Sequence, residues 1–237
     1  GKRIPLEKKD FNISQAKDCE ADVKAVWGNG DLSVIVDGVL EFDGFYKFKA
    51  GIRPVKPVAV DTVCLDIAVP DSIARLFYAI GGKANKYAWT GISLEDKADG
   101  LLWDSLSASK RHEIANKANL VSYLWLGDDD RGIAMMMDNS RSWQVDPRKA
   151  TTELVRKDGK TLIRMFLKNL PGDLAEPIDA ELSVQATPVR PRPPGGSFRK
   201  LEHAFTNRCF FFDRPLVFPG CFDEANNPKG NYGQGIA

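Results

Sequence analysis

The sequence is poor in the residues and motifs that usually mark a catalytic centre. It has only two histidines, His112 and His203, and it contains no G-x-G-x-x-G loop, P-loop, H-E-x-x-H pair or G-x-S-x-G elbow. Those patterns cradle phosphates, hold zinc or expose a nucleophilic serine. Their absence removes the sequence-based case for a nucleotide-binding enzyme, a zinc protease or an α/β-hydrolase. The catalytic residues are therefore unknown at this stage, and neither a cofactor nor a metal is predicted.

A surplus of charge of one sign is also missing. The 237 residues carry 33 Lys and Arg against 32 Asp and Glu, a formal net charge of +1. Since no net field gathers phosphates, this balance disfavours a dedicated binder of nucleic acid or of an acidic membrane. No apolar run reaches the roughly 18 residues that a membrane helix needs. The hydrophobic content of 43% supports a core, so we predict a soluble globular protein with no nucleic-acid or membrane partner.

Cysteine is scarce, with Cys19, Cys64, Cys209 and Cys221 and no C-x-x-C pair. A zinc ribbon or a thioredoxin-like motif is therefore not supported. A chain of this length folds without disulfides, so we expect buried free thiols, although Cys209 and Cys221 are near enough in sequence to form a clip. The start of the chain has neither an initiator methionine nor an apolar signal core, which we interpret as a processed or excised chain.

Short runs with a period of two, separated by turn residues, dominate the sequence. They cover residues 32–36, 39–42, 45–49, 58–69, 152–156, 161–168 and 180–186. Asp-Gly pairs at 37–38, 43–44 and 158–159 separate several runs, and Asp-Gly is a strong hairpin signal because both residues accept a positive φ. The pattern predicts an all-β fold, an antiparallel β-sandwich with one or two short helices. Apolar spacing places one helix at about 72–80, and a second, mostly polar helix is expected at about 107–118.

The main boundary signal is the sequence TPVRPRPPGG at 187–196, whose four prolines and two glycines form a stiff, extended exit. We therefore expect a β-sandwich domain at 1–194. Residues 195–237 are expected to form an aromatic-rich extension that packs on the sandwich or leads to an absent following domain.

The most distinctive polar stretch is Asp128, Asp129, Asp130 and Arg131, between the apolar runs 123–126 and 133–137. Three carboxylates and an arginine at a loop tip are suited to binding sugar hydroxyls or calcium. The aspartates do not follow the calcium-loop spacing, however, and a plain hairpin turn has the same pattern. Both interpretations remain open at this point.

Five tryptophans are plentiful for this length, and an exposed aromatic ring stacks on the apolar face of a sugar ring. Trp89 and Trp143 have polar neighbours and are predicted at the surface as glycan contacts, whereas Trp125 lies in an apolar run and is assigned to the core. The adjacent carboxylates Glu95-Asp96 and Asp223-Glu224 are interpreted as solvated loop residues, because neighbours on a strand point to opposite faces.

Three segments, taken in order, resemble a known family. They are VLEFDGFYKFKAGIRP with VDTVCLDIAVPDSIARL at 39–54 and 60–76, YLWLGDDDRGIAMMMDNSRSW at 123–143, and LSVQATPVRPRP at 182–193. Together they are similar to the N-terminal β-sandwich domain of family 123 glycoside hydrolases and related glycosidases, over about 29–193.

The resemblance implies a sandwich that accompanies a catalytic barrel, which in the family removes terminal N-acetyl-β-galactosamine with an adjacent Asp-Glu pair. A barrel needs roughly 200 residues or more, so this role is not transferred to Asp223-Glu224. The resemblance therefore implies a non-catalytic accessory domain that supports or extends glycan binding, with carbohydrate and a C-terminal catalytic domain as partners, in a secreted or periplasmic protein. The alternatives are a stand-alone sandwich lyase or hydrolase acting on polysaccharide, and a protein-interaction domain.

Overall fold

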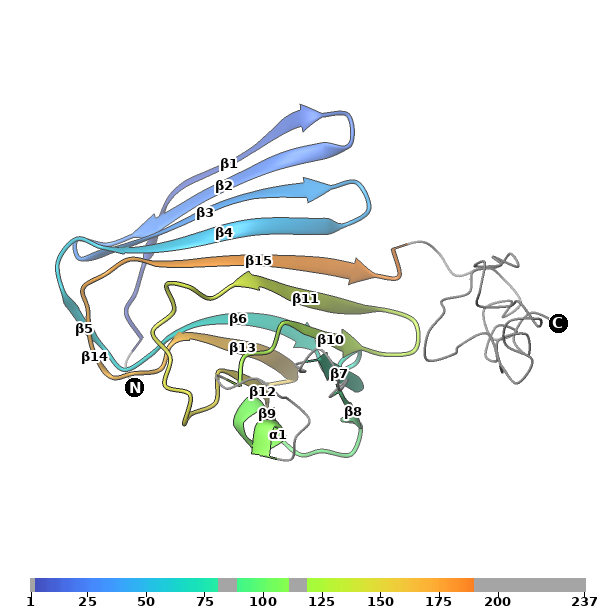
Figure 1. Ribbon diagram of the computed structural model, residues 1–237. Helices are drawn as coiled ribbons and strands as arrows, with labels where there is room; N and C mark the ends of the chain where they lie inside the picture. The colour runs from blue at the N-terminus through green and yellow to red at the C-terminus, as the bar shows by residue number, and fades with distance from the viewer. Residues whose placement is uncertain (1–2, 81–88, 111–118, 190–237) are drawn as a thin grey trace, which may run out of the picture. The chain divides into compact units, whose positions relative to one another are not determined.

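The computed structural model describes residues 3–80, 89–110 and 119–189, without the side chains of 15–17, 80 and 89–91 (Figure 1). Several sequence-based predictions lie outside these residues. They concern the extension at 195–237, both histidines, Cys209 with Cys221, and the pair Asp223-Glu224.

Two antiparallel sheets make up most of the described chain. The larger has nine strands in the order β1-β2-β3-β4-β15-β11-β10-β7-β8, and the smaller has four in the order β6-β13-β12-β9. The nine are β1 (Glu7–Lys17), β2 (Glu20–Gly28), β3 (Leu32–Glu41), β4 (Phe45–Pro54), β15 (Ile178–Thr187), β11 (Gly132–Asn139), β10 (Tyr123–Gly127), β7 (Leu76–Ile80) and β8 (Trp89–Ser93). The four are β6 (Val63–Pro70), β13 (Lys160–Lys168), β12 (Thr152–Lys157) and β9 (Gly100–Asp104).

The remaining elements are small. A third sheet pairs β14 (Gly172–Leu174) with β5 (Val58–Val60), and the six-residue helix α1 (Ser105–Lys110) follows β9. The predicted all-β antiparallel sandwich with a short helix is confirmed. No helix in the described part of the chain is long and apolar enough to cross a membrane.

The core lies between the two main sheets and follows the period-two pattern. Leu124 and Leu126 of the large sheet and Leu154 and Ile163 of the small sheet are fully buried. Their neighbours along each strand point away from the core, because successive side chains of a strand alternate between its two faces. This alternation gives the large sheet a core face and an outer face.

Figure 1 shows the β1–β4 end of the large sheet fanning away from the small sheet. The cross-strand register places Phe11, Ile13 and Leu40 on the core face of the large sheet, in line with the buried Ala50 of β4. Their exposed fractions are 47%, 58% and 41%, so the apolar face continues past the part that the small sheet covers.

Two of the three predicted Asp-Gly turns are confirmed. Gly44 between β3 and β4 has φ 83°, and Asp158 and Gly159 between β12 and β13 have φ 54° and 73°. The turn predicted at Asp37-Gly38 is wrong, since both residues lie within β3. A Cβ on Gly38 would lie 2.7 Å from the Tyr46 ring, so this glycine is needed for close packing and not for a turn.

The helix predicted at 72–80 is also wrong. Residues 71–75 form turns, and β7 follows from Leu76 to Ile80 between β10 and β8. The run predicted as one strand at 58–69 is divided into β5 and β6, which belong to different sheets. Cys19 and Cys64 are free thiols as expected but are exposed, so their predicted burial is wrong.

A buried polar network fixes the segment between α1 and β12. Asn119, with a φ of 44°, accepts a hydrogen bond from Ser105 Oγ (2.7 Å) and donates from Nδ2 to the carbonyls of Pro147 (2.9 Å) and Lys149 (3.0 Å). The Thr151 hydroxyl donates to the Asn119 carbonyl at 2.7 Å. Ser105, Asn119 and Thr151 are buried, so the network stabilises one conformation of the segment.

Candidate functional site

The acidic tip predicted as a binding loop is the turn between β10 and β11. Asp128 Oδ1 accepts the backbone N–H groups of Asp130 and Arg131, both at 2.8 Å. These two bonds lower the pKa of the Asp128 carboxyl, because they stabilise its ionised form. Asp128 therefore shapes the turn, as the structural alternative predicted, while Asp129 and Arg131 are exposed at its tip.

Trp125 lies on the outer face of the large sheet, two residues before this turn. Its indole lies directly over the backbone of Gly127 and Gly132. A Cβ atom at either position would lie only 2.5 Å (Gly127) or 2.6 Å (Gly132) from the ring, so both positions require glycine. Its Nε1–H donates to Thr187 Oγ1 on β15 at 2.9 Å. The half-buried ring thus lies across β11, held by β15 and made possible by two residues without side chains.

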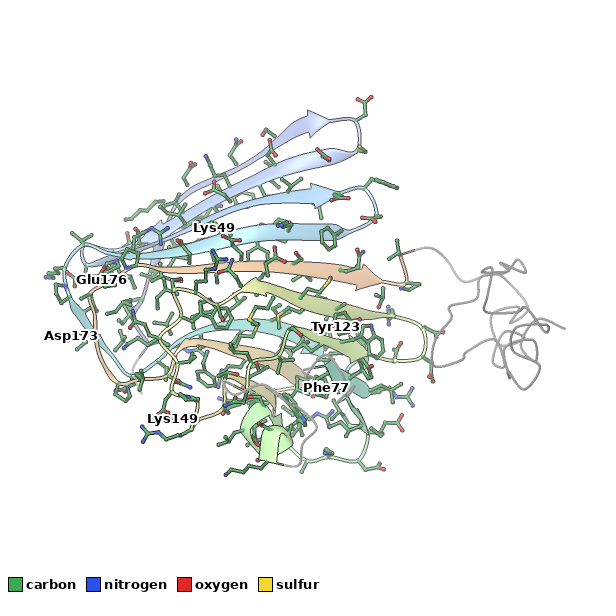
Figure 2. All side chains as sticks on the ribbon, in the orientation of Figure 1. Lys49, Phe77, Tyr123, Lys149, Asp173 and Glu176 are labelled. Carbon is green, nitrogen blue, oxygen red and sulfur yellow. The ribbon has the colours of Figure 1, made fainter. Side chains whose placement is uncertain are left out.

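Two tyrosines lie beside this ring. Tyr78 on β7 is directly opposite Trp125, and Tyr123 is the next outward residue of β10 (labelled in Figure 2). The tyrosine rings make an edge contact with centroids 6.4 Å apart, and partial burial raises the pKa of both hydroxyls. Ala134 and Gln185 continue the row on the other side of Trp125. We call Tyr78, Tyr123 and Trp125 the aromatic surface.

The tryptophans are placed differently from the sequence-based assignment. Trp143, predicted at the surface, is only 9% exposed and donates from Nε1 to the Asp179 carbonyl at 3.1 Å. Trp125, assigned to the core, is on the outer face instead. The backbone of Trp89 pairs with Ile80 at the β8 edge, but its side chain lies outside the description, so its role as a glycan contact stays a prediction.

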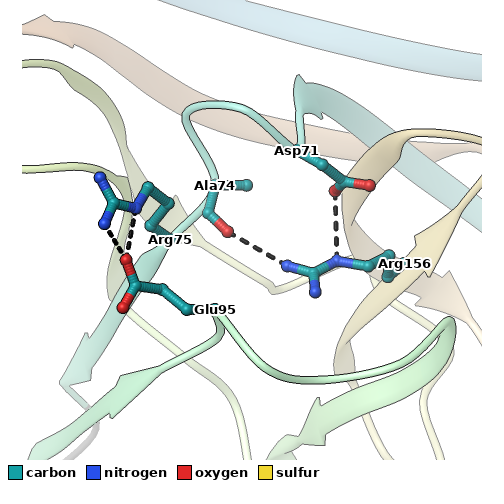
Figure 3. Close-up of a pocket in the computed structure, with 5 residues that line it drawn as sticks. All are labelled: Asp71, Ala74, Arg75, Glu95 and Arg156. Carbon is teal, nitrogen blue, oxygen red and sulfur yellow. Dashed lines mark hydrogen bonds and ion pairs between the residues drawn. The ribbon is translucent and has the colours of Figure 1, made fainter.

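A pocket of about 230 Å³ opens where the turn before β7 meets the ends of β8 and β12 (Figure 3). It is lined by Asp71, Ala74, Arg75, Glu95 and Arg156. The Arg156 side chain is almost entirely buried and donates to the carbonyls of Leu94 (3.0 Å) and Lys97 (2.5 Å). It therefore ties the strand end of β12 to the loop after β8.

The two carboxylates of the pocket each pair with an arginine. Arg156 Nε donates to Asp71 Oδ1 at 3.3 Å, and Arg75 binds Glu95 Oε1 through both Nε and Nη2 (Figure 3). The backbone N–H of Arg75 donates to the Gly127 carbonyl at 3.0 Å, so this pocket lies beside the β10–β11 turn. The arrangement offers both hydrogen-bond donors and acceptors to a polar ligand.

Sequence reasoning missed most of this pocket. Glu95 was interpreted as a solvated loop residue, and it is exposed, but it also forms the rim. Arg156 carried a usable signal, because it follows the inward-facing Thr152 and Leu154 at a spacing of two. An arginine in an inward position needs buried partners. In the described part of the chain, no three His, Cys, Asp or Glu residues are grouped so that they could hold a metal ion.

The sequence model of the third domain of glycoside hydrolase 123 matches residues 1–144, which is more than half of the chain. No curated protein matches the chain. Two solved structures show a weak overall likeness. A protein provisionally described as an aldose 1-epimerase from Escherichia coli K12 has a TM-score of 0.38 at 7% identity, over 75% of this chain and 68% of that one. A galactose mutarotase related enzyme from Lactobacillus acidophilus has a TM-score of 0.37 at 10% identity, over 76% and 72%.

Proposed function

Because the chain belongs to the family of the third domain of glycoside hydrolase 123, we propose that this module of a carbohydrate-active protein is a non-catalytic glycan-binding domain that contacts sugar through its aromatic surface. The observation that carries the proposal is the position of Trp125. One side of its ring lies on a glycine backbone, and the ring is partly open to solvent on the outer face of the sheet.

An indole in this position suits a sugar ring for a physical reason. One face of a pyranose presents C–H groups, which pack on an aromatic face, while the hydroxyls remain available for polar partners. Strand β15 supplies two such polar groups beside the aromatic surface. Thr187 holds the N–H edge of the Trp125 ring, and Gln185 lies in the same row as Trp125, on the far side of β11. The hydrogen bond to Thr187 fixes the plane of the indole before the ligand arrives, which lowers the entropic cost of binding.

The pocket supports the non-catalytic part of the proposal. Glycosidic cleavage needs two acidic groups on either side of one bond. Asp71 and Glu95 are held by Arg156 and Arg75, an arrangement suited to hydrogen bonding. We infer that catalysis belongs to another domain of a secreted or periplasmic parent protein, which this module would help to hold on its substrate.

Replacing Trp125 with alanine should weaken glycan binding at least tenfold. A glycan array identifies a ligand for the wild-type protein, and calorimetry with that ligand compares the variants. Trp125→Phe keeps an aromatic face without the N–H donor, so its affinity should lie between that of the wild type and that of Trp125→Ala. Phe11→Ala is the matched control, because Phe11 is 47% exposed on the edge strand β1 and lies on the opposite face of the large sheet. Equal affinity of Trp125→Ala and wild type, with both folded, would remove the aromatic surface as the site.

The acidic tip gives a second test of the same surface. Asp129→Ala and Arg131→Ala should leave the melting temperature within about 2 °C, since surface changes seldom alter stability by more than 0.5 kcal/mol. If the tip contacts the glycan beside Trp125, each variant weakens binding severalfold. Unfolding of both variants would instead assign Asp129 and Arg131 to the stability of the turn.

A further inference from the structure

We propose that the pocket lined by Asp71, Ala74, Arg75, Glu95 and Arg156 is a second binding site, separate from the aromatic surface, for a single neutral ring rich in hydroxyl groups. The inference goes beyond the proposed function, since it concerns other residues and does not require that Trp125 contact a glycan.

The size of the pocket sets the size of the ligand. Its volume of about 230 Å³ is below the range of roughly 300–1,000 Å³ that is usual for drug-sized ligands. A single six-membered ring with its substituents fits such a volume, whereas a chain of several sugars does not. The ligand is thus a monosaccharide, or the terminal unit of a glycan.

The floor of the pocket is rigid and has donor capacity left. A guanidinium carries five N–H donors. Arg156 directs four of them to Asp71, Leu94, Lys97 and Ala74, through the bonds described above and a 3.3 Å bond from Nη2 to the Ala74 carbonyl. The remaining Nη2 hydrogen is available to a ligand oxygen, and no reorganisation of the buried side chain is needed to present it.

The rim can open. The side chains of Arg75 and Glu95 are 50% and 43% exposed, and exposed ion pairs of this kind contribute little to stability. Both contacts from Arg75 go to Glu95 Oε1. Within the described residues, Glu95 Oε2 has no protein donor, so it can accept a hydroxyl hydrogen while the arginine donates to a neighbouring hydroxyl oxygen.

The charges around the pocket exclude other ligand classes. Its two arginines and two carboxylates cancel, and the adjacent tip with Asp128, Asp129, Asp130 and Arg131 adds a net charge of −2. Glu95 raises the pKa of Arg75, and the negative charges of Asp129 and Asp128 make smaller contributions in the same direction. The tip is therefore close enough to act on the pocket electrostatically. The tip therefore repels an anion, a cation would have to displace an arginine from Asp71 or Glu95, and an apolar group finds only the Ala74 methyl.

What remains is a neutral ligand that donates and accepts hydrogen bonds over a short distance. Two hydroxyls on adjacent carbons meet this condition, because one can donate to a carboxylate while the other accepts from a guanidinium. Both kinds of partner lie side by side in the Arg75–Glu95 pair and in the Arg156–Asp71 pair.

The test is an NMR titration of the full chain with D-galactose and D-glucose as neutral probes, and with D-glucuronate and D-glucosamine as charged analogues. A neutral hexose should produce saturable shifts of the Ala74, Arg75 and Glu95 amides. Glu95→Gln and Arg75→Gln should each weaken this binding at least fivefold.

Asp37→Asn is the matched control, because Asp37 pairs with Lys24 on the exposed outer face, at 3.4 Å and far along the sheet. Both Asp37→Asn and Trp125→Ala should leave the pocket affinity unchanged.

Absence of saturable shifts with both hexoses, tighter binding of either charged analogue, or unchanged affinity in both pocket variants would overturn the proposal. If Trp125→Ala no longer binds the array ligand but still binds the hexose in the pocket, the result supports two separate sites. If Trp125→Ala binds the array ligand as tightly as the wild type, the proposed function is contradicted and the pocket proposal is unaffected. A failure of the proposed function is therefore distinguishable from a failure of the pocket proposal.

Discussion

Arg156→Ala should lower the free energy of unfolding by about 3 kcal/mol, within the range of 3–5 kcal/mol measured when one partner of a buried ion pair is removed. The substitution leaves Asp71 without its arginine, removes the side-chain donor of the Lys97 carbonyl, and leaves the Leu94 carbonyl with only the 3.3 Å bond from the Lys97 N–H. For a domain of this size, the loss corresponds to a fall of about 6–12 °C in melting temperature. Thermal and urea unfolding, followed by circular dichroism, measure it.

Arg164→Ala is the matched control for this change. Arg164 binds Asp66 through two bonds of 2.9 Å, but both side chains are about one quarter exposed on the outer side of the small sheet. Solvent screens this pair, so its loss should cost about 1 kcal/mol or less. If Arg156→Ala lowers the free energy of unfolding no more than Arg164→Ala does, the buried guanidinium does not hold the loop after β8.

Asn119→Ala should cost about 3 kcal/mol, by a different route. The change removes the acceptor of the buried Ser105 hydroxyl and Thr151 N–H, and a buried group left unpaired costs about 1–3 kcal/mol, less any relaxation or water entry. It also removes the donor to the part-buried carbonyls of Pro147 and Lys149. It also places alanine at a φ of 44°, where asparagine and glycine are tolerated better.

Asn119→Gly separates the two contributions. Glycine removes the same hydrogen bonds but accepts the positive φ without strain, so it should recover only about 1 kcal/mol of the loss. Urea unfolding of both variants makes the comparison. Full recovery by glycine would show that backbone conformation, and not the buried network, determines the stability of this segment.

The strand content of the fold was predictable where local signals agree. In the β12–β13 hairpin, Leu154 and Ile163 alternate with polar residues on either side of Asp158-Gly159, and the observed register pairs them directly. The alternation fixes the buried face and the turn fixes the register, so no distant contact is needed to define this unit.

The segment at 72–80 was not predictable, because its apolar residues fit two periods. Ile73, Leu76, Phe77 and Ile80 have helical spacing, but Phe77 and Ala79 also alternate as a strand. The partners that decide between them, β10 on one side and β8 on the other, include a strand that begins more than 40 residues later. Pairing with distant strands overrides a local preference of this size.

Trp125 shows a signal that was present and was given too little weight. Leu124 and Leu126 are fully buried, so the residue between them must point to the opposite face. Its apolar neighbours favoured the core, whereas the pleat of the strand requires the outer face. The glycines beneath the ring come from positions 127 and 132, and only the pairing of β10 with β11 brings both under one indole.

The position of β15 has a consequence for how the chain is made. This strand pairs with β4 on one side and with β11 on the other, so it joins the β1–β4 meander to the rest of the large sheet. On the ribosome, β1–β4 can pair as soon as they emerge, but the sheet stays in two parts until Thr187 has left the exit tunnel. The segment 1–144 that carries the family match lacks β12, β13 and β15, so within it the small sheet has only β6 and β9, which do not pair with each other.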